Sequence, residues 1–304
     1  MRLKFVPVFL MLTGALAGFA WPPRAAAQNP DAMMPEANEA KARQILKDLI
    51  DTMGGPAYLS VTQRYCEGRR AQFGHAGDLT GYIPFKDYWN YPDKDRTEYI
   101  AKSHNTLLGY MIGVTDLDLS HGGTIITLYN GDQGWTMDRA GVEEMPATSI
   151  ADFREAVKKN IDNLLRYRLK ENGISVRWAG GDIVDLKPVD WVEIQDKDQR
   201  VFRLAVERST HLLIRSVVTT SDQDMGEKVD DSTIYSNYQR VGGLYVPMQI
   251  TRERNGRKYY QAFFDACDFN PNLPPDFFTK ASLDQRFQKS GNKKEKDKYK
   301  NAKD

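Results

Sequence analysis

The sequence has few cysteines and no surplus of basic charge. Only two cysteines occur in 304 residues, so the chain is not a disulfide-rich scaffold. Its 42 Lys and Arg residues nearly balance 41 Asp and Glu residues, for a formal net charge of +1. Three basic residues and no acid lie in residues 1–27, and residues 289–304 carry seven lysines against three acids, which leaves the body between them at −6. An acidic body excludes a basic nucleic-acid-binding face as its main feature, and we expect no nucleic-acid partner.

Familiar catalytic motifs are also absent. The chain contains no His-Glu-x-x-His, no Gly-x-Ser-x-Gly, no phosphate loop and no Gly-x-Gly-x-x-Gly. Its four histidines occur singly, without the Cys, His or carboxylate neighbours that metal-ligand spacing requires. We therefore expect a protein that is not an enzyme, with no catalytic residue, no metal and no cofactor.

Residues 1–27 are typical of a cleavable export signal. Met1–Lys4 is basic, Phe5–Ala20 is apolar, and Ala25–Ala27 supplies the small residues of a cleavage site near Ala27. The apolar run is shorter than a membrane-spanning helix needs, and no second run follows it. No cysteine lies near the cleavage site, so the bacterial lipoprotein route is not indicated. We expect a soluble periplasmic protein.

Two helices are predicted from apolar spacing. Residues 28–39 are polar and contain proline, which favours a flexible lead-in. Apolar residues then recur at steps of three and four between Ala42 and Met53, before Gly54-Gly55-Pro56 ends the helix. A second stripe runs from Phe153 to Leu165, after a capping box formed by Ser149 and Asp152. The side chains expected to cover the sheet as a lid are Ile45, Leu46, Leu49, Phe153, Val157 and Ile161.

The rest of the body alternates between apolar and polar residues, as β-strands do, up to about Phe269. Asn130-Gly131-Asp132 is a strong hairpin signal. The predicted class is α+β: a single antiparallel sheet of about ten to eleven strands, which curls strongly or closes because its twist accumulates, covered by two amphipathic helices. The domain spans residues 40–288, and the Lys-rich tail 289–304 is predicted to be disordered.

Period-two alternation assigns one residue in two to the concave face. Some of the many aromatic residues would fill a core, and the others would line a cavity for an apolar ligand. The predicted cavity-lining residues are Tyr99, Trp135, Phe202, Leu204, Ile214, Val246 and Met248. Cys66 and Cys267 lie on the first and last long strands, where they form either a disulfide or two buried thiols.

Three segments resemble the LolA-like periplasmic family of lipoprotein carriers and outer-membrane lipoprotein-sorting proteins. Phe85–Tyr99 contains a strand, a proline turn, and then an Arg and an aromatic on the return strand. Asn130-Gly131-Asp132-Gln133-Gly134-Trp135 resembles the family's Gly-then-Trp hairpin, and Tyr235–Tyr238 with Gly242–Pro247 resembles its late strands. The motifs keep the family's order, and the resemblance extends from about Ala40 to Phe278.

The resemblance implies an unclosed antiparallel barrel whose helices form a lid over an apolar cavity. It also implies that Arg96 stands where an arginine of the carriers holds the lid through helix-loop carbonyl groups. The alternative for Arg96 is a surface residue that pairs with Asp93 or Glu98. An extra stretch around Gly109–Gly123 departs from a minimal carrier, so the ligand need not be a lipoprotein.

Two functions follow from this resemblance. The first is a soluble exported carrier or binding protein for acyl chains of lipids or lipoproteins, which shields them in an apolar cavity during transfer to the outer membrane. The alternative is a periplasmic regulatory module that uses the same half-barrel to sense envelope lipid or to hold a membrane partner. We expect a monomer whose partners are acyl chains and a membrane donor or acceptor protein.

Overall fold

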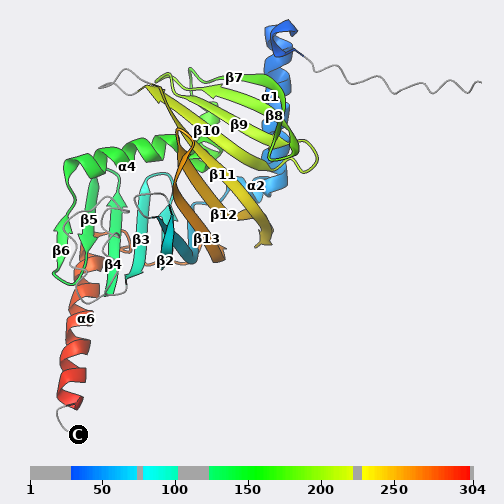
Figure 1. Cartoon of the computed structure of the whole chain (residues 1–304). Coiled ribbons are helices and arrows are strands. Elements are labelled where there is room, and N and C mark those ends of the chain that lie inside the picture. Colours follow the sequence, from blue (N-terminus) through cyan, green and yellow to red (C-terminus); the bar gives the residue numbers. More distant parts are fainter. Residues whose placement is uncertain (1–28, 74–77, 102–122, 222–227, 302–304) are drawn as a thin grey trace, which may run out of the picture.

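The computed structural model describes residues 29–73, 78–101, 123–221 and 228–301 (Figure 1). The predicted export signal and most of the extra stretch before Gly123 lie outside the described residues. Thirteen strands form one sheet, and all neighbouring strands are antiparallel. The strands are β1 (Gln63–Phe73), β2 (Leu79–Asn90), β3 (Lys94–Ala101), β4 (Gly123–Asn130), β5 (Gln133–Met137), β6 (Val142–Glu144), β7 (Ser175–Val184), β8 (Lys187–Gln195), β9 (Val201–Glu207), β10 (Leu213–Ser221), β11 (Lys228–Val241), β12 (Leu244–Arg254) and β13 (Arg257–Phe269).

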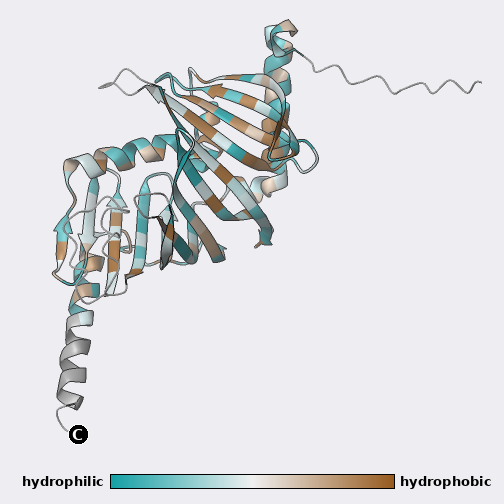
Figure 2. Cartoon of the chain, viewed as in Figure 1, coloured by the Kyte–Doolittle hydropathy of each residue, from teal (hydrophilic) through white to brown (hydrophobic). Residues whose placement is uncertain are grey.

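The order of the strands brings the first and the last strand together. It is β6-β5-β4-β3-β2-β1-β13-β12-β11-β10-β9-β8-β7, so β1 pairs with β13 in the middle of the sheet. Strands β6 and β7 are the two unpaired edges, so the sheet is not closed. The prediction of a single curved, unclosed antiparallel sheet is confirmed, but the number of strands was underestimated. Brown and teal residues alternate along many strands in Figure 2, as the predicted period of two requires.

The helices are η1 (Pro30–Ala32), α1 (Pro35–Met53), α2 (Pro56–Leu59), α4 (Ala147–Lys159), α5 (Ile161–Arg166), η2 (Arg168–Lys170) and α6 (Lys280–Asn301). The first helix begins earlier than predicted, because Pro35 suits a first turn and Asn38 is bound to the sheet. The Asn38 side chain accepts a hydrogen bond from the Trp178 backbone N–H at 2.7 Å and donates one to the Trp178 carbonyl at 3.0 Å. Residues 35–39 are therefore part of a packed helix and not of a flexible lead-in.

Three further predictions need correction. The second stripe forms two helices, α4 and α5, because Asn160 ends one and its side chain caps the other. Helix α4 begins at Ala147 with no side-chain cap, so the capping box of Ser149 and Asp152 is not formed. Helix α6 continues to Asn301 and takes in most of the segment predicted to be disordered.

Helices lie on both faces of the sheet. We call the face that contacts α1 and α5 the inner face, and the opposite face the outer face. Helix α1 buries Ala42, Leu46, Leu49 and Met53 in one cluster with side chains of β7–β12. Leu283 of α6 packs on the outer face of β4 and β5 with Trp135. Figure 1 shows α4 across one end of β3–β5, and α6 extending beyond the opposite end of the neighbouring strands.

Candidate functional site

The inner face carries a large apolar cluster at one end of the sheet. Four predicted cavity-lining residues belong to it, namely Phe202, Leu204, Val246 and Met248. Phe202 and Leu204 are fully buried, because α1 lies directly against this part of the sheet. These four residues and the lid residues Leu46 and Leu49 share one core.

Tyr99 lies in a second apolar cluster of the inner face, with Ile83, Phe85 and Ile125. Its hydroxyl accepts a hydrogen bond from Nη1 of Arg70 at 3.0 Å. Burial raises the pKa of Tyr99 to about 12, although the nearby Arg70 opposes this shift. Phe264 packs against both clusters, so the apolar part of the inner face continues across the middle of the sheet.

Two predicted cavity-lining residues lie on the outer face instead. Leu213 pairs with Val206 and Arg215 with Ala205, so a bulge places Ile214 on the side of Ala205, away from Leu204. Trp135 is opposite Leu128, on the face that α6 covers. The prediction that Ile214 and Trp135 face the same side as Leu204 is wrong, because alternation within one strand does not fix the register of its neighbours.

Arg96 holds a helix, but a different one from the two predicted. Its Nη1 donates to the carbonyl oxygen of Phe277 at 3.1 Å and to the hydroxyl of Ser282 at 3.2 Å, which fixes the start of α6 on the outer face. Its Nε and Nη2 donate to Oε1 of Glu98 at 3.0 and 2.7 Å. A pocket of about 370 Å³ adjoins these contacts, lined by Lys86, Tyr88, Arg96, Glu98, Ile100, Thr124, Phe277 and Arg286.

The two predicted lid helices are anchored very differently. Phe153 is the only buried residue of α4; its ring stacks on Tyr129 at 4.3 Å and lies near Trp89. Val157 and Ile161 are half-buried, as is Ile45 of α1, which packs against the large cluster. Little apolar area therefore binds α4 to the sheet, whereas α1 is part of the core.

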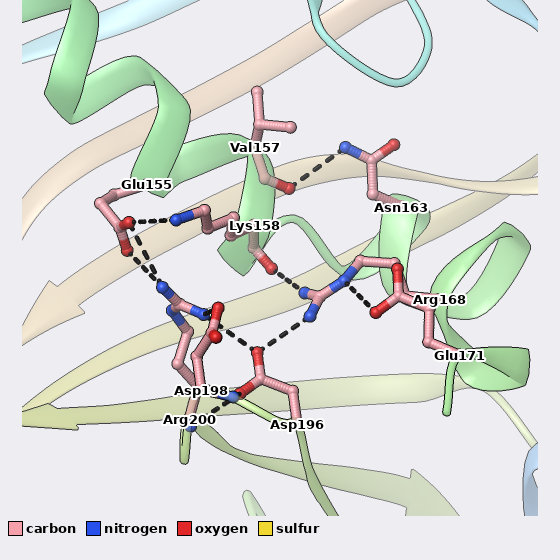
Figure 3. A network of polar contacts seen from close by, with 9 residues as sticks. All are labelled: Glu155, Val157, Lys158, Asn163, Arg168, Glu171, Asp196, Asp198 and Arg200. Carbon is pink, nitrogen blue, oxygen red and sulfur yellow. Dashed lines mark hydrogen bonds and ion pairs between the residues drawn. The ribbon is translucent and has the colours of Figure 1, made fainter. Parts of the chain in front are cut away.

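Ion pairs hold the C-terminal end of α4 (Figure 3). Nη2 of Arg200 donates to both carboxylate oxygens of Glu155, at 3.3 and 3.0 Å. Arg168 binds the carbonyl oxygen of Lys158 and also Asp196, which Arg200 binds as well. Burial opposes ionisation of Asp196, but hydrogen bonds from Arg168 and Arg200 outweigh it and lower its pKa. This end of α4 is thus joined to the β8–β9 turn by charged groups.

A charged cluster that the sequence analysis missed lies on the inner face near α5. Nη2 of Arg64 pairs with Asp87 at 2.5 Å. Asp162 of α5 accepts hydrogen bonds from the hydroxyls of Tyr58 at 2.7 Å and Tyr91 at 3.0 Å. Burial, and then the charge of Asp87, raises the pKa of Asp95 well above its ordinary value. The members of this cluster are spread along the chain from Tyr58 to Asp162, so no local sequence pattern indicated it.

Cys66 and Cys267 form a disulfide across the β1–β13 pair. They are directly opposite each other in the register, with Cα atoms 4.1 Å apart. The alternative of two buried thiols is thereby excluded. The bond joins residues 201 positions apart at the centre of the sheet.

The described part of the chain contains no group of three or more His, Cys, Asp and Glu residues that would hold a metal ion. Within the same ranges, no helix combines the length and the apolar character needed to cross a bilayer.

No protein family model and no curated protein sequence matches the chain. Solved structures do match. A DUF1329 family protein from Desulfovibrio piger has a TM-score of 0.51 at 13% identity, over 80% of this chain and 98% of that one. A LolA superfamily protein from Nitrosomonas europaea has a TM-score of 0.46 at 15% identity, over 80% and 99% of the two chains. A domain described as outer membrane lipoprotein-sorting, from Vibrio parahaemolyticus, has a TM-score of 0.48 at 11% identity, over 81% and 100%.

At sequence identities this low, a match shows only that two folds are similar. The two structures with TM-scores below 0.5 support no conclusion about the site. The chain is similar in fold to the DUF1329 family protein, and structures described as LolA superfamily and lipoprotein-sorting proteins are also among those it matches. The fold is an open, curved antiparallel sheet with helices on both of its faces.

Proposed function

We propose that this protein is an exported periplasmic carrier for acyl chains of lipids or lipoproteins. Residues 1–27 would direct its export, and its inner face would shield the chains during transfer to the outer membrane. The observation that carries the proposal is the contrast between α1 and α4 on this face. A helix with one buried side chain and several ion pairs is displaced at lower cost than a helix that belongs to the core.

The proposal assigns the lid to α4 and leaves α1 in place. Displacing α4 uncovers the large aromatic rings of Tyr129 and Trp89, of which Trp89 packs against the large apolar cluster. Acyl chains that replace Phe153 against these rings would bury a comparable apolar area. The main free-energy cost of uptake would then be the loss of two ion pairs of α4. These are Glu155 with Arg200, and Lys159 with Asp231 at 3.3 Å.

A cross-link across α4 tests this assignment. Arg154 of α4 and Asp132 of the β4–β5 turn form an exposed ion pair at 3.2 Å. Replacing both with cysteine and joining them with a bismaleimide should block uptake of a fluorescent fatty acid. The two native cysteines are bonded to each other and leave the new thiols to react alone.

A matched cross-link at the other end of the sheet is the control. Asp31 of η1 and Arg177 of β7 are an exposed pair at 3.8 Å, and linking them constrains the region before α1. Uptake should be unchanged by this link and by either double variant before linking. If no form takes up fatty acid and the purified protein holds no lipid, the carrier proposal fails; a stoichiometric membrane partner would then favour the regulatory module.

A further inference from the structure

Arginine and tyrosine side chains form a row on the inner face, across β12, β13 and β1. Arg252 is opposite Tyr260 in the β12–β13 pairing, and its guanidinium carbon lies 4.9 Å from the centre of that ring. The guanidinium carbon of Arg70 lies 4.6 Å from the same ring. Arg254 lies 5.5 Å from the ring of Tyr259. We call these five residues the arginine–tyrosine row.

Strand alternation places Arg252 on the inner face. Met248 belongs to the large apolar cluster, and Ile250 is opposite Ala262 of the second cluster. Arg252 follows at the next alternate position, so its side chain projects on the same side. It is nevertheless exposed, whereas Met248 is only 4% exposed. Water or a ligand can therefore reach this guanidinium.

The charges around Arg252 are not balanced. Arg254 pairs with Asp231 at 2.8 Å, and Lys159 of α4 pairs with the same carboxylate at 3.3 Å. Asp231 is thus shared by two cations, and Arg252, on which the charge of Asp87 also acts, has no ion-pair partner among the described residues. An unmatched guanidinium beside apolar clusters is suited to an oxyanion, which it binds through two parallel N–H groups.

We propose that the arginine–tyrosine row selects amphiphiles with an anionic headgroup, a carboxylate or a phosphate, and that Arg252 binds this headgroup. This inference rests on the proposed carrier function and specifies its ligand. Apolar residues adjoin the row on one side along the strands: Met248 precedes Arg252 on β12, and Phe264 and Phe85 are both opposite Gly68, two residues before Arg70. An amphiphile bound with its headgroup at Arg252 would lay its chains on these clusters beneath α4.

Paired ligands with and without the charge provide the test. We would measure displacement of a fluorescent fatty acid from the full chain by oleate and by methyl oleate. The intact protein should bind oleate about tenfold more tightly or better, a difference of at least about 1.4 kcal/mol. Arg252→Gln should remove this preference and leave the affinity for methyl oleate unchanged. Arg252→Lys, which keeps the charge but not the planar fork, should retain part of it.

Arg240→Gln is the matched control, because Arg240 is an exposed strand arginine 5.4 Å from the ring of Tyr245. Arg240 is adjacent to Val241 on β11, and Val241 packs against the large cluster of the inner face. Because neighbouring residues of a strand point to opposite faces, Arg240 projects from the outer face. Arg240→Gln should change neither the affinity for oleate nor the affinity for methyl oleate. Transfer from phosphatidylglycerol vesicles, compared with phosphatidylcholine vesicles, tests whether a phosphate headgroup with net negative charge is preferred to a zwitterionic one, and oleate tests a free carboxylate.

Each outcome has a separate meaning. Equal binding of oleate and methyl oleate, with no preference between the two vesicles, overturns the headgroup inference and leaves the carrier function standing. A preference that survives Arg252→Gln overturns the assignment to Arg252. Binding of none of these amphiphiles overturns the carrier function together with the inference.

Discussion

The guanidinium of Arg96 lies 4.3 Å from the centre of the Phe277 ring and donates a hydrogen bond to the carbonyl oxygen of the same residue. One strand residue therefore holds both the side chain and the backbone at the start of the C-terminal helical segment. The Arg96 side chain is 5% exposed and that of Glu98 is 12% exposed, so the pair is shielded from water.

Replacing Arg96 with Met should destabilise the protein by about 3–5 kcal/mol, because Glu98 is left as a buried charge without its partner. Urea unfolding would measure the loss, and limited proteolysis should cut first near Phe277. Arg69→Met is the control: its pair with Asp265 is 3.5 Å long and more than half exposed, so its loss should cost less than about 1 kcal/mol. Equal effects of the two substitutions would contradict the role of Arg96.

Replacing both Cys66 and Cys267 with Ala should lower the free energy of unfolding by about 2–5 kcal/mol. The bond closes a segment of about 200 residues, and its loss frees the unfolded chain more than the folded one. Urea unfolding of the intact protein with and without reductant should give the same difference. Reductant should have no effect on the double variant, and a change there would point to another cause.

Asp95→Asn should stabilise the protein at neutral and alkaline pH. Burial and the charge of Asp87 raise the pKa of Asp95 in the folded state, so the folded state holds its proton more tightly than the unfolded state. The resulting stability is complete below the unfolded pKa of about 4 and is lost as pH rises through the folded pKa. Melting temperatures of variant and intact protein should therefore agree near pH 4 and diverge above it.

The control for this titration is Asp265→Asn, an exposed carboxyl group on β13. Its melting temperature should follow that of the intact protein across the pH range. If the melting temperature of Asp95→Asn differed from that of the intact protein by the same amount at every pH, packing and not ionisation would cause the effect.

Replacing Leu204 with Asp should cost more than about 4 kcal/mol, because the site is fully buried in the α1 core and offers the charge no partner. Thermal melts should show this loss equally with and without added fatty acid. Leu186→Asp, at a position that is 95% exposed, should change stability by less than about 0.5 kcal/mol. A small loss at Leu204 would indicate that water already reaches this part of the inner face.

Local sequence determined the elements themselves. The stripe from Ala42 to Met53 requires a helix, Asn130-Gly131-Asp132 requires a tight turn, and alternation from β1 to β13 requires strands. These patterns depend on residues a few positions apart, where the geometry of helix and strand is fixed. They were enough to predict an antiparallel sheet with amphipathic helices on it, and the resemblance to a known family added that the sheet is not closed.

Tertiary structure decided which faces meet. Alternation gives each strand two faces, but only the register between strands shows that Ile214 and Trp135 turn away from Leu204. Pairing of β1 with β13 joined Cys66 to Cys267, and the position of α6 gave Arg96 its partner. The tertiary structure also places Arg70, which lies far away in sequence, beside the same Tyr260 ring as Arg252. Contacts at such separations depend on how the whole sheet is ordered, which no local pattern encodes.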